Sequence, residues 1–433
     1  DRLKLHAERR RTLCALNSIV LLIRGEYEDF TAAQSSKSKM PRAVWTHMQD
    51  FIIWADLGHD QLYVVLVYLT VRNIAKDPGI IDHLGLDNAS LEASIRSFLE
   101  WYQHLTPSGA TMTYDQVALF NDALFIHTHF NVAQFLQGES SPYQVAALQE
   151  ITRTDGVEAL KVFLLQNIGY MCALRFADNY MSSLFMDATN ATTLFTALQV
   201  LQCVETSSPH AIYWNFIAAR AVQLRLPSAT PEDFAVARLA CLCRATQSNM
   251  RGIPQAWGKL NASERTLLTN HFLADGVDES NFVLKFLPSY LAHAHQNPRV
   301  GLHAALVVLC DVLDTLHTRL ITTGEPVSRV VNIQELANFA ERVESRSVFQ
   351  AVGSYLTFVG PDTDLTVLVA AAHMQRVSQR SWSEQPAQEA ANMVKRMRRQ
   401  IESLGVGGAR RETALAEVLP ADAESPRLSV TRV

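Results

Sequence analysis

The sequence lacks the short motifs by which several large classes of enzyme are recognised. It contains no G-x-x-x-x-G-K-[ST] loop, no G-x-G-x-x-G after a strand, no H-E-x-x-H pair and no G-x-S-x-G turn. These absences remove most of the support for P-loop nucleotide hydrolysis, dinucleotide chemistry and zinc-dependent proteolysis. We therefore expect a protein that is not an enzyme, with no catalytic residue and no cofactor.

Charge is also scarce. Only 19% of the 433 residues are charged and 48% are hydrophobic, and the net charge is -5. A negative chain is a poor candidate for a protein whose whole surface binds nucleic acid, although a local basic groove is compatible with it. The low charged fraction fits either a large monomer or a subunit whose apolar surface is covered by its neighbours.

Cysteine and histidine do not occur in metal-binding patterns. The six cysteines stand at irregular spacing inside apolar runs, as buried reduced thiols do. Cys241 and Cys243 form a C-x-C pair with no second pair at zinc-finger spacing. The pairs His127–His129 and His293–His295 lie in helical pattern, where residues two apart point in different directions. No metal site is predicted.

No apolar run is long enough to cross a membrane as a helix. The longest near the N-terminus, 13–23, follows the basic residues 9–11 but is shorter than the ~20 residues that a span needs, and no small-residue cleavage site follows it. We expect it to form a first buried helix, and we expect no membrane insertion.

What the sequence does contain is helical periodicity. Apolar residues recur at spacings of three and four along 91–102, 160–171 and 305–316, and prolines and glycines interrupt the pattern at intervals that suit ordinary helices. Helix starts are indicated at 87–90, 230–233 and 261–264. Strand character is confined to short runs such as 61–71 and 327–331, and a parallel sheet is not expected.

The fold class predicted is all-α, a two-lobed helical body with terminal extensions. Two prolines at 227 and 231 interrupt the longest helical stretch and suggest a boundary between lobes. The expected divisions are an N-terminal segment at 1–40, an N-terminal lobe at 41–228, a C-terminal lobe at 229–385, and a basic helix with a polar tail at 386–433.

A cluster of arginines and aromatic residues lies near the middle of the chain. Between residues 209 and 251 the only acidic residues are Glu232 and Asp233. Arginines can hold backbone phosphates in a cleft, and aromatic rings can stack on exposed bases. The alternative is that the rings are core and the arginines extend to water. The candidate RNA-binding residues are Arg220, Arg225, Arg238, Arg244, Arg251, Tyr213 and Trp214.

A second cationic feature lies at 388–404. Its apolar residues repeat at spacings of three, four and three, and its cations fill the other faces, which predicts a helix that docks on a partner subunit or an anionic surface. The candidate subunit-contact residues are Val394, Met397, Ile401 and Leu404 on the apolar stripe and Lys395, Arg396, Arg398 and Arg399 beside it.

The stretch 208–214, which reads Ser-Pro-His-Ala-Ile-Tyr-Trp, and its continuation through the arginines to 231–233 resemble rhabdovirus-type nucleoproteins. In that family a proline, an aromatic cluster with tryptophan and an arginine-bearing helix precede the second part of the RNA-gripping body. This chain differs in placing the segment near its middle, and 141–144 matches the family's Ser-Pro-Tyr-Ser only in part. Size and helical content equally resemble the capsid proteins of small double-stranded RNA viruses such as partitiviruses.

The resemblances imply a viral structural protein that assembles with copies of itself and encloses genomic RNA without sequence specificity, in the virion and the host cytoplasm. The partners are then RNA and further copies of the chain, as a polymer or a shell. Three alternatives remain open: an icosahedral shell subunit, a cellular helical scaffold that binds only proteins, and an all-helical enzyme. The last would use Asp311 and Asp314, a D-x-x-D pair similar to the magnesium-binding carboxylates of terpene synthases.

Overall fold

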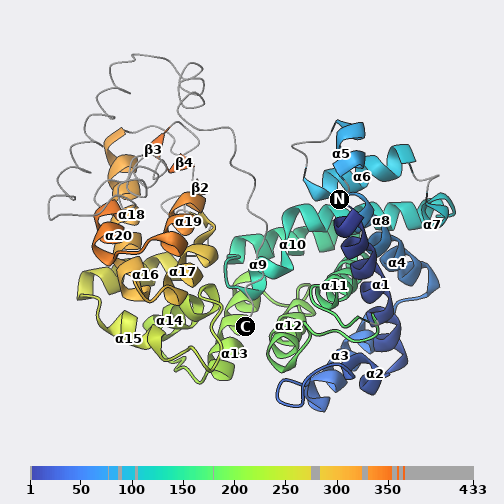
Figure 1. Cartoon of the computed structure of the whole chain (residues 1–433), viewed down its shortest axis with the longest axis horizontal. Coiled ribbons are helices and arrows are strands. Elements are labelled where there is room, and N and C mark those ends of the chain that lie inside the picture. The colour runs from blue at the N-terminus through green and yellow to red at the C-terminus, as the bar shows by residue number, and fades with distance from the viewer. Residues whose placement is uncertain are drawn as a thin grey trace. The chain divides into compact units, whose positions relative to one another are not determined.

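The computed structural model describes residues 2–76, 78–85, 90–102, 106–178, 180–274, 283–323, 330–353, 358–359 and 364–365. Within these ranges the chain forms helices α1 to α20 and four strands of two or three residues, so the predicted all-α class is confirmed (Figure 1). The chain divides into two compact units, Asp1–Asn281 and Phe282–Val433. No helix in the described ranges combines the length and the apolar character that crossing a bilayer requires.

The first unit contains sixteen helices in its described residues. They are α1 (Arg2–Arg24), α2 (Tyr27–Thr31), α3 (Arg42–Ala55), α4 (His59–Ile74), α5 (Pro78–Leu84), α6 (Leu91–Tyr102), α7 (Pro107–Ala110), α8 (Tyr114–His129), α9 (Val132–Leu136), α10 (Pro142–Asp155), α11 (Val157–Cys172), α12 (Ala188–Leu201), α13 (Pro209–Leu224), α14 (Pro231–Leu242), α15 (Gly252–Gly258) and α16 (Ala262–Leu273).

Capping residues start these helices where the sequence indicates a start. Thr230 and Asn261 each form a capping box with the residue three places on, at the starts of α14 and α16. The Oγ of Ser90 accepts a hydrogen bond from the backbone N–H of Ala93 just before α6. These bonds satisfy backbone N–H groups that the first turn of a helix leaves without a partner. The predicted starts at 230 and 261 are therefore confirmed.

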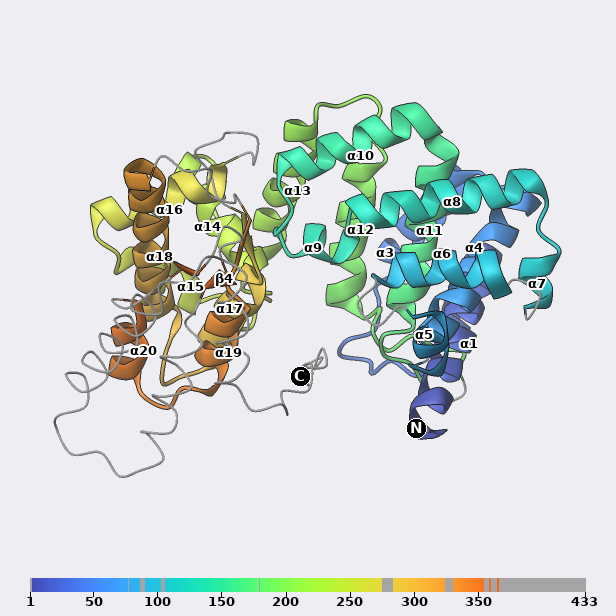
Figure 2. The same ribbon diagram turned by 90° about the horizontal axis from the view of Figure 1, so that it is seen from above.

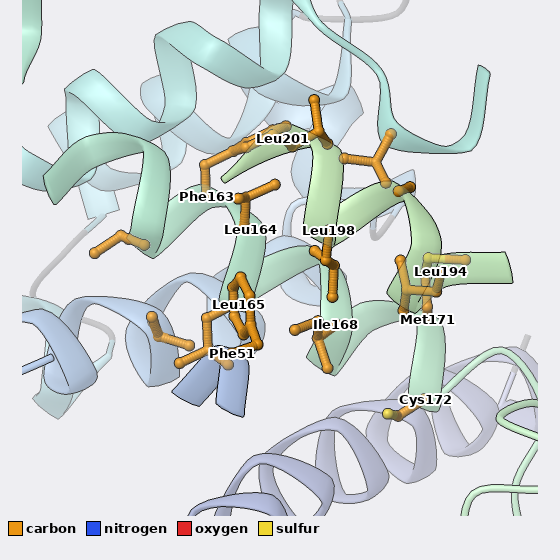
Figure 3. Close-up of a cluster of buried hydrophobic side chains, with 14 of the residues drawn as sticks. Phe51, Phe163, Leu164, Leu165, Ile168, Met171, Cys172, Leu194, Leu198 and Leu201 are labelled. Carbon is orange, nitrogen blue, oxygen red and sulfur yellow. The ribbon is translucent and has the colours of Figure 1, made fainter. Parts of the chain in front are cut away.

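The core of the first unit is organised around α11. Eleven of its sixteen residues are buried, and it packs against α1, α4, α8 and α10 (Figures 1 and 2). A helix that is apolar on nearly every side is stable only when other helices surround it. Figure 3 shows part of this core, where side chains of α11 and α12 gather with Phe51 of α3.

The N-terminal segment belongs to this core. The apolar run 13–23 lies within α1, which packs against α3, α4 and α11, so the predicted helix is buried on one side, while Leu13, Val20 and Ile23 are exposed. The run 61–71, which has strand character in the sequence, lies within α4. Valines and tyrosines there are held in a helix because α4 packs between α1, α8 and α11, and such packing overrides local propensity.

The second unit combines helices with a small sheet. Its described elements are β1 (Val283–Lys285), α17 (Leu287–Gln296), α18 (Leu302–Thr323), β2 (Val330–Asn332), α19 (Gln334–Arg342), α20 (Arg346–Gly353), β3 (Phe358–Val359) and β4 (Asp364–Leu365). The strand order is β1-β2-β4-β3; β2 is parallel to β1 and β4, and β3 is antiparallel to β4. This parallel pairing corrects the expectation of no parallel sheet, since strands of two or three residues leave no readable periodicity in the sequence.

The division between units differs from the predicted lobe boundary. Residues 226–231 lie inside the first unit, between α13 and α14, and these two helices pack against each other. The two prolines there end one helix and begin the next without separating two cores.

The cysteines are reduced thiols, as their spacing predicts. Cys203 is exposed, and the other five are buried. Burial raises the pKa of Cys14 to about 11, and it also raises the pKa values of Cys172, Cys241 and Cys243. These thiols are protonated at neutral pH.

Candidate nucleic-acid interface

Helix α13 carries three of the predicted RNA-binding residues, and its boundaries follow from its sequence. The Ser208 hydroxyl accepts a hydrogen bond from the backbone N–H of Ala211, and Pro209 occupies the first turn, where it costs no hydrogen bond. The helix ends at Arg225, whose φ of 58° lies in the left-handed region. Glycine usually occupies that position, because a side chain there costs about 1 kcal/mol.

Helix α14 ends in a similar way. It begins at the Thr230 capping box and ends at Cys243, after which Arg244 adopts a φ of 52°. Each of these two neighbouring helices is thus followed by an arginine in a conformation that favours glycine. Arginine near a helix C-terminus also interacts favourably with the helix dipole.

The two helices run in the same direction. Trp214 in the first half of α13 lies edge-on to Phe234 in the first turn of α14, with ring centroids 5.8 Å apart. In the last turn of α13, the carbonyl of Gln223 accepts a hydrogen bond of 3.0 Å from the side chain of Gln247, which lies after the end of α14. Because early residues meet early residues and late residues meet late ones, the C-terminal ends of α13 and α14 lie on the same side.

Two of the candidate residues, Tyr213 and Arg238, are buried and donate hydrogen bonds to the backbone of Gly138. The Tyr213 hydroxyl and the Arg238 Nε both donate to the Gly138 carbonyl, at 2.9 and 3.0 Å, and Arg238 Nη1 donates to the Phe272 carbonyl at 2.6 Å. Tyr213 is fully buried and Arg238 is 8% exposed. These contacts correct the prediction for both residues, because neither has a free face for a base or a phosphate.

Arg220 is likewise buried, at 7% exposure. Its Nη1 donates to Thr193 Oγ1 at 2.8 Å and also to the Gln223 side chain, so it joins α13 to α12. Its Nε forms no hydrogen bond within the described residues. Trp214 is half-buried, and its indole Nε1 donates to His210 Nε2 at 2.9 Å. Arg220 is corrected to a structural residue, whereas Trp214 keeps part of its ring accessible.

The other three arginines are exposed and lie on the segments that follow α13 and α14. Arg225 follows α13, and Arg244 and Arg251 stand at the two ends of the loop that Gln247 ties to the end of α13. Within the part of the chain that the structure describes, no carboxylate forms an ion pair with any of them. We call Arg225, Arg244 and Arg251 the arginine edge.

The electrostatics of the arginine edge favour an anion. Three unit charges stand against roughly -0.5 at the C-terminal end of each of two helices and against the carboxylate of Glu139, which leaves about +1. Arg244 Nε donates to Gln137 Oε1 at 2.9 Å. Desolvation lowers the pKa of Arg244 and the charge of Glu139 raises it, and arginine keeps its charge throughout the physiological range.

Two further acids, Glu232 and Asp233, lie at the opposite end of α14 from Arg244. Asp233 belongs to the Thr230 capping box, and Glu232 accepts a hydrogen bond of 2.6 Å from Trp257 Nε1 and pairs with Arg265 at 3.4 Å. Twelve helical residues separate this end from Arg244, a distance of about 18 Å. That distance exceeds the screening length of about 8 Å at physiological salt, so these carboxylates do little to Arg244.

Sequence reasoning found the arginines but missed the residues that bring them together. Gln247 and Gln223 carry no charge and fit no motif, and Gly138 lies 100 residues before Arg238. The left-handed arginines leave a weaker signal: each follows a helical run directly, where glycine is the common residue.

The remaining candidate residues fall into two groups. The helix at 388–404, with Val394, Met397, Ile401, Leu404 and the four cations beside it, lies outside the described residues. His127–His129, His293–His295 and Asp311–Asp314 lie on α8, α17 and α18. No group of three metal-binding side chains occurs in the described ranges.

Comparison with known proteins gives a family but no activity. A family model described as a family of unknown function (DUF6829) matches residues 4–350 of the chain. No curated protein and no solved structure matches it.

Proposed function

We propose that this chain, which belongs to the DUF6829 family of unknown function, is a structural protein of an RNA virus. In this proposal it binds genomic RNA through its phosphates and assembles with copies of itself. The observation that carries the proposal is the arginine edge. Its three exposed cations have no ion-pair partner within the described residues, and they lie on the segments that follow α13 and α14, which the hydrogen bond from Gln247 to Gln223 joins.

Phosphate binding without sequence specificity is what such an edge can do. Exposed guanidinium groups on loops and helix ends reach backbone phosphates, whereas reading bases requires donors and acceptors placed against their edges. Trp214 offers part of an aromatic face on α13, which supports stacking as a secondary contact. The residues Tyr213, Arg220 and Arg238 take no part in this proposal, since they hold α12, α13 and α14 in position.

Exposed apolar residues of the first unit support the assembly half of the proposal. Leu13, Val20 and Ile23 of α1 are exposed, and with the half-buried Leu16 they repeat at spacings of three, four and three. Ile23 also lines an apolar pocket, together with Ile53, which is 74% exposed. The stripe 394–404 has the same spacing, and we propose that in the assembly it docks on α1 of a second copy.

The test of RNA binding is a triple substitution, Arg225→Gln, Arg244→Gln and Arg251→Gln, in the full chain. Affinity for a single-stranded RNA is measured by fluorescence anisotropy over a range of salt concentrations. Each phosphate contact contributes about -0.7 to the slope of log K against log salt, so the triple variant should have a slope shallower by about 2. The triple variant should lose the same factor in affinity for poly(U) as for a mixed-sequence RNA.

The matched control removes three exposed arginines elsewhere in the first unit, by Arg24→Gln, Arg42→Gln and Arg153→Gln. All three are more than 65% exposed, and the change in net charge is the same. The control should keep the wild-type salt slope. Equal losses in both triple variants would mean that net charge alone controls binding, and the arginine edge would then have no special role.

A further inference from the structure

A polar cluster lies inside the helical core of the first unit, away from the arginine edge. Helix α4 contributes Tyr68 and Arg72, which are four residues apart on one face, and Lys76 follows two residues after the end of α4. Helix α11 opposes them with Gln166 and Tyr170, and the two helices pack together. The Arg72 guanidinium lies 3.6 Å from the centroid of the Tyr170 ring, so the two side chains are stacked. We call these five residues the α4–α11 cluster.

The deep end of the α4–α11 cluster is closed by His127 of α8. Its ring stacks on Tyr68, with centroids 4.8 Å apart and planes 9° apart, and its Nε2 lies 3.1 Å from Gln166 Oε1. Tyr68 is 1% exposed and Gln166 is fully buried. Side chains at this depth do not meet bulk water, so each of their polar atoms needs a partner within the protein.

Three buried atoms of the cluster donate no well-aligned hydrogen bond within the described residues. They are the Tyr68 hydroxyl, Arg72 Nη1 and Gln166 Nε2. All three carry hydrogen that can be donated. The charge of Arg72 and a side-chain hydrogen bond between Arg72 and Tyr68 oppose the burial that raises the pKa of Tyr68 to about 12, which places the two groups close together. The phenol hydrogen of Tyr68 and the Gln166 Nε2 hydrogens still have no acceptor, so they call for one beside Arg72.

The cluster also holds more positive than negative charge. Arg72 pairs with no carboxylate in the described ranges, and Lys76 and Arg11 of α1 share the single carboxylate of Glu8. Glu92 of α6 is a further acid whose charge reaches Tyr68. Burial and the charge of Arg72 lower the pKa of Lys76 to about 8. Excess buried charge of one sign is costly unless a counter-charge accompanies it.

We propose that the α4–α11 cluster binds one small inorganic anion, held by the Tyr68 hydroxyl, Arg72 Nη1 and Gln166 Nε2. A metal ion is excluded by the donor character of these atoms, and a water molecule would satisfy hydrogen bonds but not the charge. The RNA backbone cannot reach atoms on side chains this deeply buried. This site therefore does not depend on the proposed RNA-binding function, and either can be wrong without the other.

The test is thermal unfolding of the full chain at increasing sodium phosphate or sodium chloride, with sodium gluconate holding the ionic strength constant. An ion that binds only the folded protein raises Tm with the logarithm of its concentration once the site is half filled. For wild type we expect a rise of about 2–4 °C between 1 and 100 mM of the preferred ion. Gluconate, a bulky anion, should have no such effect.

Two variants test whether the effect arises at the α4–α11 cluster. Arg72→Met removes the cation and should abolish the dependence on the anion. Gln166→Glu places a carboxylate next to Arg72, where it takes over the role of the ion. This variant should be at least as stable as wild type without added anion, and it too should lose the dependence.

The matched control is Arg42→Met, which removes an exposed arginine that also stacks on a tyrosine, Tyr27, at 4.3 Å. It should keep the full dependence on the anion. The proposal is overturned if no anion raises Tm beyond gluconate, or if Gln166→Glu keeps the wild-type dependence. Persistence of that dependence in Arg72→Met would likewise show that anions stabilise the protein by a general solvent effect.

Discussion

His127 is a histidine that the fold holds in its neutral form. Burial and the charge of Arg72 lower its pKa to about 3, and the hydrogen bond with Gln166 partly opposes them. In the unfolded chain the pKa is about 6.5. As the pH falls below 6.5 the unfolded chain binds a proton that the folded protein excludes, so the free energy of unfolding falls toward acid.

We predict that His127→Phe removes this acid sensitivity. Between pH 6.5 and pH 5.0 wild type should lose about 1.5 kcal/mol of unfolding free energy more than the variant does. Urea unfolding at the two pH values, followed by circular dichroism, measures the difference. The neighbouring change Ile126→Val lowers stability by about 1 kcal/mol without removing a titrating group, so it should keep the wild-type pH slope. An unchanged slope in His127→Phe would show that His127 is protonated in the folded protein.

At the scale of single residues, the sequence shows that arginines cluster in a segment, but it does not show which of their side chains are buried and which are exposed. An arginine on an apolar helix either extends to water or finds backbone carbonyls inside the protein, and only the fold decides between these outcomes. Arg238 is buried because Gly138 and Phe272, 100 and 34 residues away in sequence, place their carbonyls against it. Arg225 and Arg244 are exposed because their helices end there.

At the scale of helices, Gly138 is the point where α9, α13 and α14 meet. Its φ is 67°, and a Cβ built there would lie 3.0 Å from the Cβ of Cys241 on α14. Its carbonyl also accepts hydrogen bonds from both α13 and α14. A side chain at this position would therefore push α14 away from the carbonyl that holds it.

We predict that Gly138→Ala costs more stability than Gly85→Ala. Both glycines have a similar positive φ, 67° and 64°, but no atom lies within 4 Å of a Cβ at Gly85. Each variant should lose about 1 kcal/mol for the backbone conformation, and Gly138→Ala about 1–3 kcal/mol more for the close contact. Chemical denaturation of the two variants gives the difference. Equal losses would mean that α14 moves aside freely.

Helix starts could be predicted from the sequence, and helix directions could not. The capping residues Thr230 and Asn261 act within four residues of themselves, so a local pattern reveals them. The parallel packing of α13 and α14 depends on a loop that runs back along the pair and on contacts such as Gln247 to Gln223. Such contacts carry no periodicity, and the gathering of the arginine edge therefore could not be predicted.

At the scale of the whole molecule, the sequence predicts an all-α fold because apolar residues recur every three to four positions along most of the described helices. The division into units at 281–282 instead of near 228 reflects packing. Prolines mark the ends of helices whether or not a core ends with them. The proposed assembly also belongs to this scale, because a single copy offers an RNA only a short row of cations.

We predict that the purified full chain forms rings or filaments that protect RNA. Negative-stain electron microscopy shows the particles, and the ratio of absorbance at 260 and 280 nm before and after ribonuclease shows whether RNA is protected. The triple variant of the arginine edge should assemble with less RNA. Closed spherical particles would instead support a shell subunit, and a monomer without nucleic acid would contradict the proposed assembly.

The burial of most of the thiols allows local opening of the structure to be followed by alkylation. Cys203 is exposed and will react with an alkylating reagent at once, whereas Cys14, Cys172, Cys241 and Cys243 lie buried in the first unit and Cys310 in the second. A buried, protonated thiol reacts only when the structure around it opens. The alkylated peptides identified over time therefore report the opening of each unit separately, with Cys310 as the reporter for the second unit.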